Sequence, residues 1–483
     1  MPASRHQEDT CSFSGRLHSG ARSGRWHSSS ENTTGRGVGF AGASGGRWMA
    51  VLACWALAGC AEPAAEAPET PTERGSAYSV PRAESASRWP EFLGPTRDGR
   101  AAQEPEMDKA ASVELELLWR RPLGPGYSGI VVDGGRVFTL FSDGTSDVLM
   151  GMSAATGDEL WRHVLAPTLE DNGGAEEGPL STPAVLGDAV YALGPRGQLV
   201  AVGVRDGELL WERDVVRELG AGIPEFHLTT SPMIFGDLLV VQVASRRRGF
   251  VCGLDRSSGE TRWCTGRGGA GYQSPARLNL GDGQVVVAVS NSHLMGLEPD
   301  SGVQRWTYKY DRRGEEGASH PILAGERRIL IQGSDGFALF ELSLESEVLQ
   351  VEKVWENEMF HHNFDVPLYH EGYLYSFGGK LLTCLNVHTG RSVWRSKKTG
   401  GGNAILVGPF LAVWSPGGTI RMVRATPEGY NEVASLKLLD EGSYTAPSYA
   451  DGTLFVRNLQ EIAAARVLPL QDEHLSARQE EFR

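Results

Sequence analysis

The chain has 483 residues and a formal net charge of −14 at pH 7, an acidic excess that disfavours binding to nucleic-acid phosphates. Glycine contributes 61 residues and tryptophan 12, while the apolar content is an ordinary 40%. This balance is typical of many short strands and tight turns rather than long helices. The run Arg246-Arg247-Arg248 does not make nucleic-acid binding more favourable, because three like charges in a predicted loop usually form a solvated surface.

The first sixty residues are expected to be a leader. An apolar run from Trp48 to Ala58 ends at Leu57-Ala58-Gly59-Cys60; it is too short to span a bilayer but has the length of a signal-peptide core. Its last four residues resemble the lipobox of bacterial lipoproteins, which implies acylation of Cys60. Residues 1–46 would make an unusually long start, so translation begins later, for example at Val38, or the segment is a genuine extension.

The segment after Cys60 is expected to be a tether. Residues 61–87 are rich in Ala, Pro and Glu and show no apolar periodicity, which is typical of a semi-extended linker. A folded body over residues 88–469 follows, and residues 470–483 form a charged tail.

Internal repeats dominate the body. In five segments a glycine precedes a tryptophan by four residues, and degenerate copies add two more, giving Trp119, Trp161, Trp211, Trp263, Trp306, Trp355 and Trp394. Their spacing of 39 to 52 residues matches a propeller blade of four short strands. We expect each tryptophan to pack between neighbouring blades; stacking on a cofactor is the alternative.

Glycine turns mark eight such units. Each turn separates two strand-like runs, such as Ala189–Leu193 after the turn at Gly187, and supplies the positive φ that a tight hairpin needs. The turns lie at Asp133-Gly134-Gly135, Gly187-Asp188, Gly236-Asp237, Gly281-Asp282-Gly283, Gly325-Glu326, Glu371-Gly372, Gly408-Pro409 and Asp451-Gly452.

The last unit, from Tyr444 to about Pro469, holds only three strands, and residues 113–121 can supply the fourth. The sequence therefore predicts an all-β fold, a single eight-bladed β-propeller of four-stranded blades. An N-terminal strand closes the ring and removes its exposed edges.

One pair of cysteines is a candidate for a disulfide bond. Cys252 and Cys264 flank the turn Asp255–Glu260 symmetrically, so a hairpin that pairs Asp255 with Thr261 places them opposite one another. A disulfide and a pair of reduced, buried thiols are both compatible with this placement, because adjacent antiparallel strands rarely offer ideal disulfide geometry.

The repeats resemble the pyrroloquinoline-quinone-like β-propeller family. The lead-in Arg88-Trp89-Pro90-Glu91-Phe92-Leu93-Gly94-Pro95-Thr96-Arg97-Asp98-Gly99 and the segment Ala425-Thr426-Pro427-Glu428-Gly429-Tyr430 also look like versions from environmental bacteria. The resemblance covers roughly residues 88–468. It implies the propeller fold and, for different members, either a lipoprotein role in outer-membrane β-barrel assembly or quinone-dependent alcohol oxidation.

The sequence favours a binding protein over an enzyme. The quinone-dependent relatives clamp the cofactor with two adjacent cysteines, and this chain has no Cys-Cys pair, Cys-x-x-Cys-His, phosphate loop or serine elbow. His361-His362-Asn363 with Asp365 suggests a metal site, but adjacent side chains on a strand point to opposite faces. We therefore expect no cofactor or metal; a quinone-dependent dehydrogenase and a carbohydrate- or polymer-binding propeller are the alternatives.

Residues before each innermost strand are candidates for ligand contact at the mouth of the central channel. The candidates are Tyr127, His227, Tyr272, His320, His362, Asp365 and Tyr444. Aromatic rings offer contact area and histidines offer polar direction. The alternative is that the aromatics cap the inner strands while the histidines are ordinary solvated loop residues.

Together these features predict a non-catalytic propeller outside the cytoplasm, lipid-anchored to a bacterial membrane, with the outer membrane favoured. Its partners would be a protein or peptide and the membrane, not nucleic acid. We expect it to be a monomer within a complex, with scaffolding in envelope assembly as its task.

Overall fold

The computed structural model describes residues 88–168, 178–224, 227–245, 249–266, 272–279, 283–290, 292–309, 320–325, 327–332, 336–345, 348–358, 365–442 and 444–471. All of them lie within Gly75–Arg483, the second of the two units into which the chain divides. The expected leader with Cys60, the expected tether and residues 472–483 of the expected tail lie outside the described residues.

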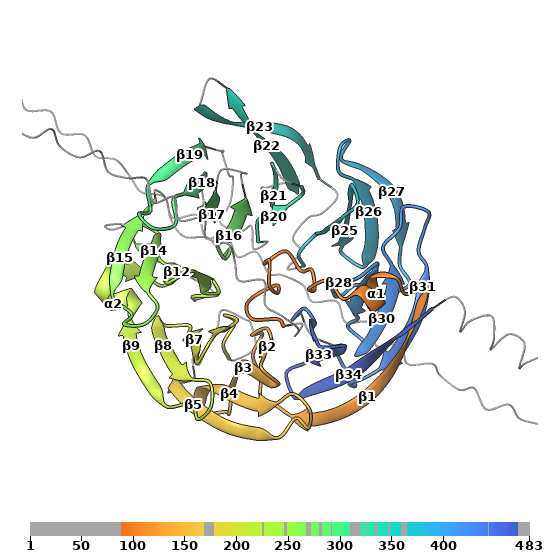
Figure 1. Cartoon of the computed structure of the whole chain (residues 1–483), viewed down its shortest axis with the longest axis horizontal. Helices are drawn as coiled ribbons and strands as arrows, with labels where there is room; N and C mark the ends of the chain where they lie inside the picture. Colours follow the sequence, from red (N-terminus) through yellow and green to blue (C-terminus); the bar gives the residue numbers. More distant parts are fainter. Residues whose placement is uncertain are drawn as a thin grey trace, which may run out of the picture. The chain divides into compact units, whose positions relative to one another are not determined.

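The described residues form a ring of eight four-stranded antiparallel sheets, which confirms the predicted eight-bladed propeller (Figure 1). From the innermost strand outward, the first four blades are β2 (Val131–Asp133), β3 (Arg136–Ser142), β4 (Ser146–Ser153) and β5 (Glu159–Pro167); β6 (Ala184–Leu186), β7 (Ala189–Leu193), β8 (Gln198–Gly203) and β9 (Leu209–Asp214); β11 (Met233–Phe235), β12 (Leu238–Gln242), β14 (Val251–Asp255) and β15 (Thr261–Thr265); and β16 (Ala276–Asn279), β17 (Gln284–Val289), β18 (His293–Leu297) and β19 (Gln304–Lys309).

Blades 5 to 8 continue the ring. They consist of β20 (Ile322–Leu323), β21 (Arg328–Gln332), β22 (Phe337–Glu345) and β23 (Val348–Asn357); β24 (Leu368–His370), β25 (Tyr373–Gly378), β26 (Leu381–Asn386) and β27 (Arg391–Ser396); β28 (Asn403–Val407), β29 (Phe410–Trp414), β30 (Thr419–Arg424) and β31 (Glu432–Lys437); and β32 (Ser448–Ala450), β33 (Thr453–Arg457), β34 (Glu461–Leu470) and β1 (Ser112–Pro122).

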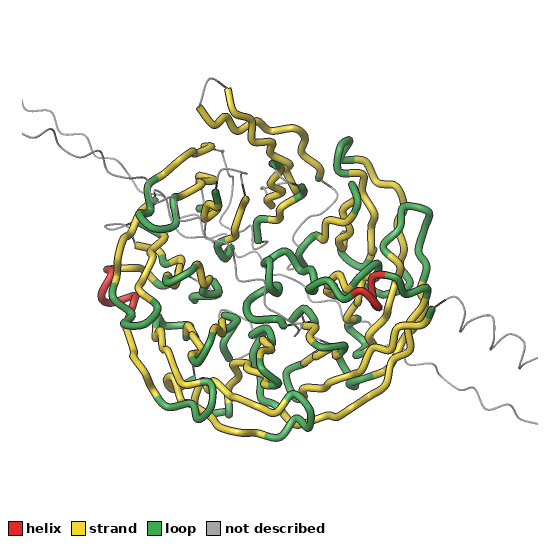
Figure 2. Tube along the Cα trace, viewed as in Figure 1, coloured by secondary structure: helices red, strands yellow, loops and turns green. Residues whose placement is uncertain are grey.

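Little else is regular, as Figure 2 shows. The described helices are α1 (Pro105–Asp108) and α2 (Val215–Leu219), and a small ribbon pairs β10 (Ala221–Gly222) with β13 (Ala244–Ser245). The Asp214 carboxylate caps α2 by accepting a hydrogen bond from the Arg217 amide, and Gly220 ends it in a left-handed conformation. Neither described helix has the length and apolar run that crossing a bilayer requires.

The ring closes through the N-terminal strand, as predicted. β1 pairs antiparallel with β34 from Ser112 opposite Leu470 to Pro122 opposite Glu461. The buried Arg457 side chain of β33 joins this blade to blade 1, donating hydrogen bonds to the Leu140 carbonyl at 2.6 Å and the Gly124 carbonyl at 3.0 Å. The seam is therefore held by both a strand ladder and a buried side chain.

The repeated tryptophans join neighbouring blades. Trp161 donates a hydrogen bond from Nε1 to the Val204 carbonyl of blade 2 at 2.9 Å, and its ring covers Gly207, where a Cβ atom would come within 2.5 Å. Trp119, Trp211, Trp263, Trp355 and Trp394 donate to the carbonyls of Ala154, Arg256, Pro299, Val387 and Thr426. Trp306 is buried too, but its Nε1 has no hydrogen-bond partner among the described residues.

The two paired cysteines lie in the outer half of blade 3. Cys252 in β14 lies opposite Cys264 in β15, and a disulfide joins them, with the Cα atoms 4.1 Å apart. The pairing nearer the turn differs from the expectation: Leu254, not Asp255, lies opposite Thr261. The reason is a β-bulge next to Gly253, which shifts the register after the cysteine pair.

Candidate functional site

The lead-in segment, residues 88–111, crosses the centre of the ring (Figure 1). It contacts all eight blades. Its backbone bridges to Val132 in β2 and accepts from Val185 in β6. In blade order from blade 3, the further contacts are to Ile234, Pro275, His320, Tyr369, Leu406 and Tyr449. The central channel is therefore occupied by the protein's own chain.

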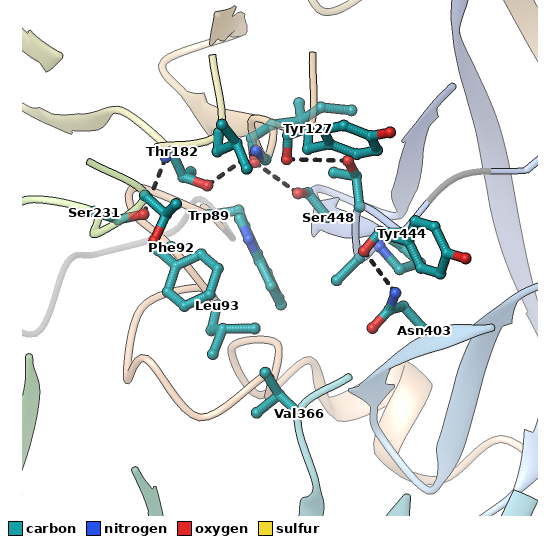
Figure 3. A pocket seen from close by; sticks show the side chains of 17 residues that line it. Trp89, Phe92, Leu93, Tyr127, Thr182, Ser231, Val366, Asn403, Tyr444 and Ser448 are labelled. Atoms are coloured by element: carbon teal, nitrogen blue, oxygen red, sulfur yellow. Dashed lines mark hydrogen bonds between the residues drawn. The ribbon is translucent and has the colours of Figure 1, made fainter. Parts of the chain in front are cut away.

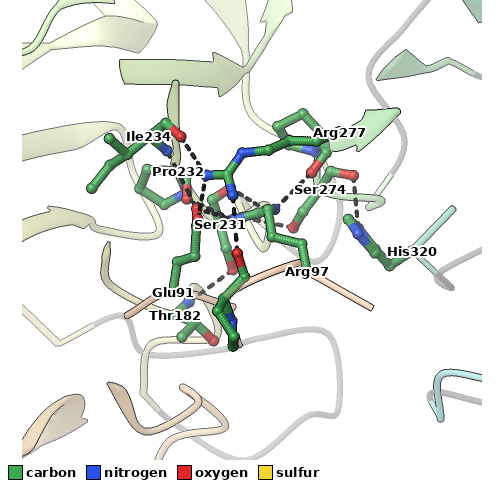
Figure 4. A network of polar contacts seen from close by, with 11 residues as sticks. Glu91, Arg97, Thr182, Ser231, Pro232, Ile234, Ser274, Arg277 and His320 are labelled. Carbon is green, nitrogen blue, oxygen red and sulfur yellow. Dashed lines mark hydrogen bonds and ion pairs between the residues drawn. The ribbon is translucent and has the colours of Figure 1, made fainter. Parts of the chain in front are cut away.

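A buried ion cluster holds this segment in place (Figure 4). The Arg97 guanidinium lies 3.0 Å from the Glu91 carboxylate, and the two side chains are 0% and 4% exposed. Arg277 of blade 4 pairs with the same carboxylate, and Arg97 also donates to the carbonyls of Pro232 and Pro275 at 3.0 and 2.9 Å. Burial lowers the pKa of Arg97 to about 10, although Glu91 counteracts this effect.

His320 lies beside this cluster rather than at the mouth. It is 1% exposed, its ring packs edge-on against Phe92, and its Nδ1 lies 3.0 Å from the Ser274 carbonyl. Burial, together with the positive charge of Arg97, lowers the pKa of His320 to about 3. The imidazole is therefore neutral at ordinary pH, and Nδ1 is the nitrogen that donates to the carbonyl.

A pocket of about 90 Å³ lies beside the lead-in segment (Figure 3). Trp89, Phe92 and Leu93 of the lead-in segment line one part of it. Hydroxyl and amide groups from four blades also line it, namely Thr182, Thr229, Ser231, Asn403, Thr445 and Ser448. The pocket thus combines apolar surface with hydrogen-bonding groups, a combination that suits contact with an amphipathic ligand.

Tyr127 and Tyr444 also line the pocket, and their ring centroids lie 6.4 Å apart. Tyr444 is 68% exposed. Its backbone carbonyl accepts a hydrogen bond from Asn403 Nδ2 at 2.6 Å, and the Tyr127 carbonyl accepts one from Thr445 Oγ1 at 3.1 Å. Backbone anchors therefore set the positions of two rings contributed by blades 8 and 1.

The lining chemistry suits recognition more than reaction. No carboxylate, imidazole, amine or thiol occurs among the described residues that line the pocket. Proton transfer and nucleophilic catalysis usually rely on such groups. At about 90 Å³, the pocket is also far smaller than the roughly 300–1,000 Å³ typical of small-molecule sites. It has room for one side chain of a partner rather than a large cofactor.

The structure brings together only part of the predicted channel-mouth set. Tyr127 and Tyr444 line the pocket, whereas Tyr272, His227, His320 and Asp365 are described but do not. Asp365 turns toward its own blade, accepting hydrogen bonds from Ser376 Oγ and the Phe377 amide at 2.7 Å each, and burial raises its pKa to about 6. His362 lies outside the described residues.

Sequence reasoning missed the lead-in residues of the pocket. The segment containing Trp89, Phe92 and Leu93 precedes the repeats. From the sequence it indicated only a likeness to a family, not a place in the binding site. Its unusual content of Trp, Phe and Leu within five residues was the available signal. A periodic search cannot find it, because the segment occurs once while the blades recur.

A family model described as outer membrane protein assembly factor BamB matches residues 113–308 and 227–349. Curated proteins with that name are 26% identical over 129 residues in Burkholderia pseudomallei (strain K96243), 27% over 208 residues in Kangiella koreensis (strain DSM 16069 / JCM 12317 / KCTC 12182 / SW-125) and 29% over 217 residues in Alkalilimnicola ehrlichii (strain ATCC BAA-1101 / DSM 17681 / MLHE-1). These matches cover 26%, 42% and 44% of this chain and 29%, 47% and 50% of the relatives. The chain thus spans half or less of the curated relatives it matches.

Solved structures show the same fold. BamB from Moraxella catarrhalis is 17% identical with a TM-score of 0.52, and the match covers 73% of this chain and 97% of that one. Quinohemoprotein alcohol dehydrogenase from Comamonas testosteroni is 12% identical with a TM-score of 0.60, covering 78% and 80%. At such identities the likeness shows the propeller alone.

The residues of this chain do not fit the quinone site of the dehydrogenases. The sequence has no adjacent cysteines to form the clamp, and the disulfide of blade 3 joins its two outermost strands rather than the channel. Among the described residues, no three His, Cys, Asp or Glu side chains gather as a metal site. Trp89 and Phe92 come from the segment that occupies the channel.

Proposed function

We propose that this chain, whose repeats resemble the pyrroloquinoline-quinone-like β-propeller family, is a non-catalytic scaffold that binds protein partners during outer-membrane protein assembly. The matching family model and the curated relatives carry the name of an assembly factor. The observation that carries the proposal is the occupied channel, where the lead-in segment leaves a small pocket suited to a partner's side chain. The dehydrogenase likeness extends to the fold only.

A partner would engage the pocket through Tyr127 and Tyr444. These rings would clamp an apolar side chain, while Ser231, Asn403 and Ser448 would hydrogen-bond to the backbone beside it. Aromatic residues that bury large area with little rotamer entropy are frequent interface anchors. The same pocket gives a carbohydrate ligand both stacking surface and hydroxyl partners, so sugars belong in the test.

The decisive experiment measures folded outer-membrane barrels in cells that lack the gene. We expect their amount to fall and the wild-type gene to restore it. A gene with Tyr127→Ala and Tyr444→Ala should restore it poorly. Val303→Ala, which also shortens a side chain that is 59% exposed, should restore it fully. Unchanged barrel levels in the deletion strain would end the assembly proposal.

The enzyme alternative has a separate test. Purified protein is titrated with pyrroloquinoline quinone and calcium while absorbance and alcohol oxidation are followed, and then with a panel of oligosaccharides. We expect no saturable quinone binding. Stoichiometric binding with alcohol turnover would establish a dehydrogenase instead, and saturable sugar binding that Tyr444→Ala abolishes would establish a carbohydrate-binding propeller.

Attachment to a membrane through a lipid on Cys60 is part of the proposal. Cys60→Ala should move the protein from the membrane fraction to the soluble fraction, because one cysteine carries the acyl chains. Cys54→Ala, which removes a neighbouring thiol in the same apolar run, should leave the distribution unchanged. Equal fractionation of the wild type and Cys60→Ala would refute the anchor.

A further inference from the structure

The outer strand of blade 6 and the loop after it carry an unusual concentration of positive charge. Arg391, Arg395, Lys397 and Lys398 are all exposed, and no acidic residue occurs between positions 387 and 402. We call these four residues, together with Lys380, the basic strip. In a chain with a formal charge of −14, such a local reversal of sign calls for a physical explanation.

The outer-strand arginines of the other blades are neutralised, although the outer-strand Lys437 of blade 7 donates only to the Gly417 and Asp440 carbonyls. Every arginine in their outer strands forms an ion pair with a carboxylate, and the pairs are Arg162–Glu159, Arg213–Glu218, Arg262–Asp255, Arg305–Glu298, Arg120–Glu461 and Arg121–Asp158. Within the described part of the chain, Arg391, Lys397 and Lys380 form no ion pair. At Arg391, Lys397 and Lys380, blade 6 thus presents cations that no ion pair of the described residues neutralises, while Lys398 lies over the Tyr430 ring, 5.1 Å from its centroid.

Lys380 joins the strip at the end of the blade where β27 ends. Leu382 in β26 pairs with Ser396 in β27, so Lys380 lies near Lys397 at the same end of the blade. A Cβ atom on Gly401 would lie 3.8 Å from the Lys380 Cα, so the loop after β27 folds back over the turn that holds Lys380. This loop leads directly to Asn403 at the channel pocket.

An apolar side chain interrupts the charges. Val393 is 45% exposed, because a register shift opposite Cys384 and Leu385 leaves it without a pairing partner in β26. Trp394 next to it is held inward by its hydrogen bond to the Thr426 carbonyl. The surface therefore offers one apolar contact between Arg391 and Arg395.

Acidic charge on the neighbouring strands favours one of two kinds of anionic partner. β23 of blade 5 carries the exposed Glu352, whereas Glu356 of the same strand and Glu432 of β31 in blade 7 are paired with Lys353 and Arg421. A broad anionic surface such as a lipid bilayer would meet the Glu352 carboxylate along with the cations. A narrow polypeptide segment can lie on the basic strip alone.

We propose that the basic strip docks an acidic, extended segment of a partner protein, with one apolar residue of that segment against Val393. The attraction comes from charge complementarity, which raises the association rate and weakens as salt screens it. The proposal does not depend on the channel-mouth pocket, because none of the five cations lines it.

The test uses the full-length protein and a fluorescein-labelled peptide of repeated Glu-Glu-Val units, with binding followed by fluorescence anisotropy at low and high salt. We expect saturable binding at low salt. Arg391→Glu combined with Lys397→Glu should weaken it about tenfold or more. Lys109→Glu combined with Arg205→Glu is the matched control, because both residues are exposed and the net charge changes equally.

The control variant should bind the peptide like the wild type. Equal weakening by both variants would overturn the proposal, since net charge alone would then explain binding. Absence of peptide binding to the wild type would also overturn it. Phosphatidylglycerol vesicles provide the remaining arm: if vesicles bind through the strip while the peptide does not, the strip faces a membrane and the proposal is wrong.

Discussion

Gly207 illustrates how one blade constrains a residue of the next. Its φ is 71°, and the Trp161 ring lies where a Cβ atom would be, 2.5 Å away. Gly187 has a similar φ of 63° but open space at the same position. The two glycines therefore share the backbone requirement, and only Gly207 carries the packing requirement.

Replacing these two glycines separates the two requirements. Gly187→Ala should cost about 1 kcal/mol of unfolding free energy through backbone strain. Gly207→Ala should cost about 2 kcal/mol more, because its methyl group displaces the Trp161 ring. Urea denaturation monitored by tryptophan fluorescence measures both values, and equal losses would show that the tryptophan contact adds nothing.

His320 makes the fold sensitive to acid. Burial lowers the pKa of His320 from 6.5 to about 3. Between these two pH values His320 is therefore protonated in the unfolded chain and neutral in the folded chain. The stability tied to this group is therefore complete above pH 6.5 and is lost as the pH falls from there toward 3. Between pH 7 and pH 5 the loss should be about 2 kcal/mol.

His320→Gln tests this dependence, since an amide can still donate to the Ser274 carbonyl but does not titrate. Urea denaturation of both proteins at pH 7 and pH 5 should show a smaller loss for the variant, by about 2 kcal/mol. Identical losses would mean that folding does not lower the pKa of His320.

At the scale of elements, closure of the ring depends on β1. Its Val113 is 3% exposed against β34, whereas Leu117 on the same strand is 43% exposed. Without β1, β34 would present an unpaired edge, which is a ready template for pairing between molecules. A single strand thus protects the last blade from self-association.

Val113→Asp should loosen β1, because it buries a carboxylate against β34. We expect higher oligomers in size-exclusion chromatography with light scattering. Leu117→Asp adds the same charge on the exposed side and should elute like the wild type. If Val113→Asp also elutes like the wild type, closure tolerates the loss of this contact.

At the scale of the whole molecule, the lead-in segment joins blades that are distant in sequence. Arg97 reaches the Pro275 carbonyl across 178 positions, and Arg100 reaches the Tyr369 carbonyl across 269. The Glu91 carboxylate serves Arg97 and Arg277 together. A change at Glu91 therefore affects the attachment of the lead-in segment to two blades.

Glu91→Gln should lower the unfolding free energy by about 3 kcal/mol, because it leaves two cations in a buried cluster without their counter-charge. Glu159→Gln removes an exposed partner of Arg162 and should cost less than about 0.5 kcal/mol. Urea denaturation compares them, and a small effect at Glu91 would mean that the lead-in segment releases easily.

The sequence by itself determined the ring. Glycine turns recur in all eight blades and the repeated tryptophans in seven of them. A blade packs mainly on its neighbours, so these local periodic signals specify the eight blades and the closing role of β1. Part of the candidate site followed as well, since Tyr127 and Tyr444 occupy equivalent positions before two innermost strands.

Only the tertiary structure decided what fills the channel. Trp89, Phe92 and Arg97 occur once, outside the repeat, and their partners come from blades far along the chain. The burial of His320 and the contrast between the basic strip and the paired arginines of the other blades also depend on such distant contacts. No local pattern encodes them, because burial and charge pairing are set by which segments meet in space.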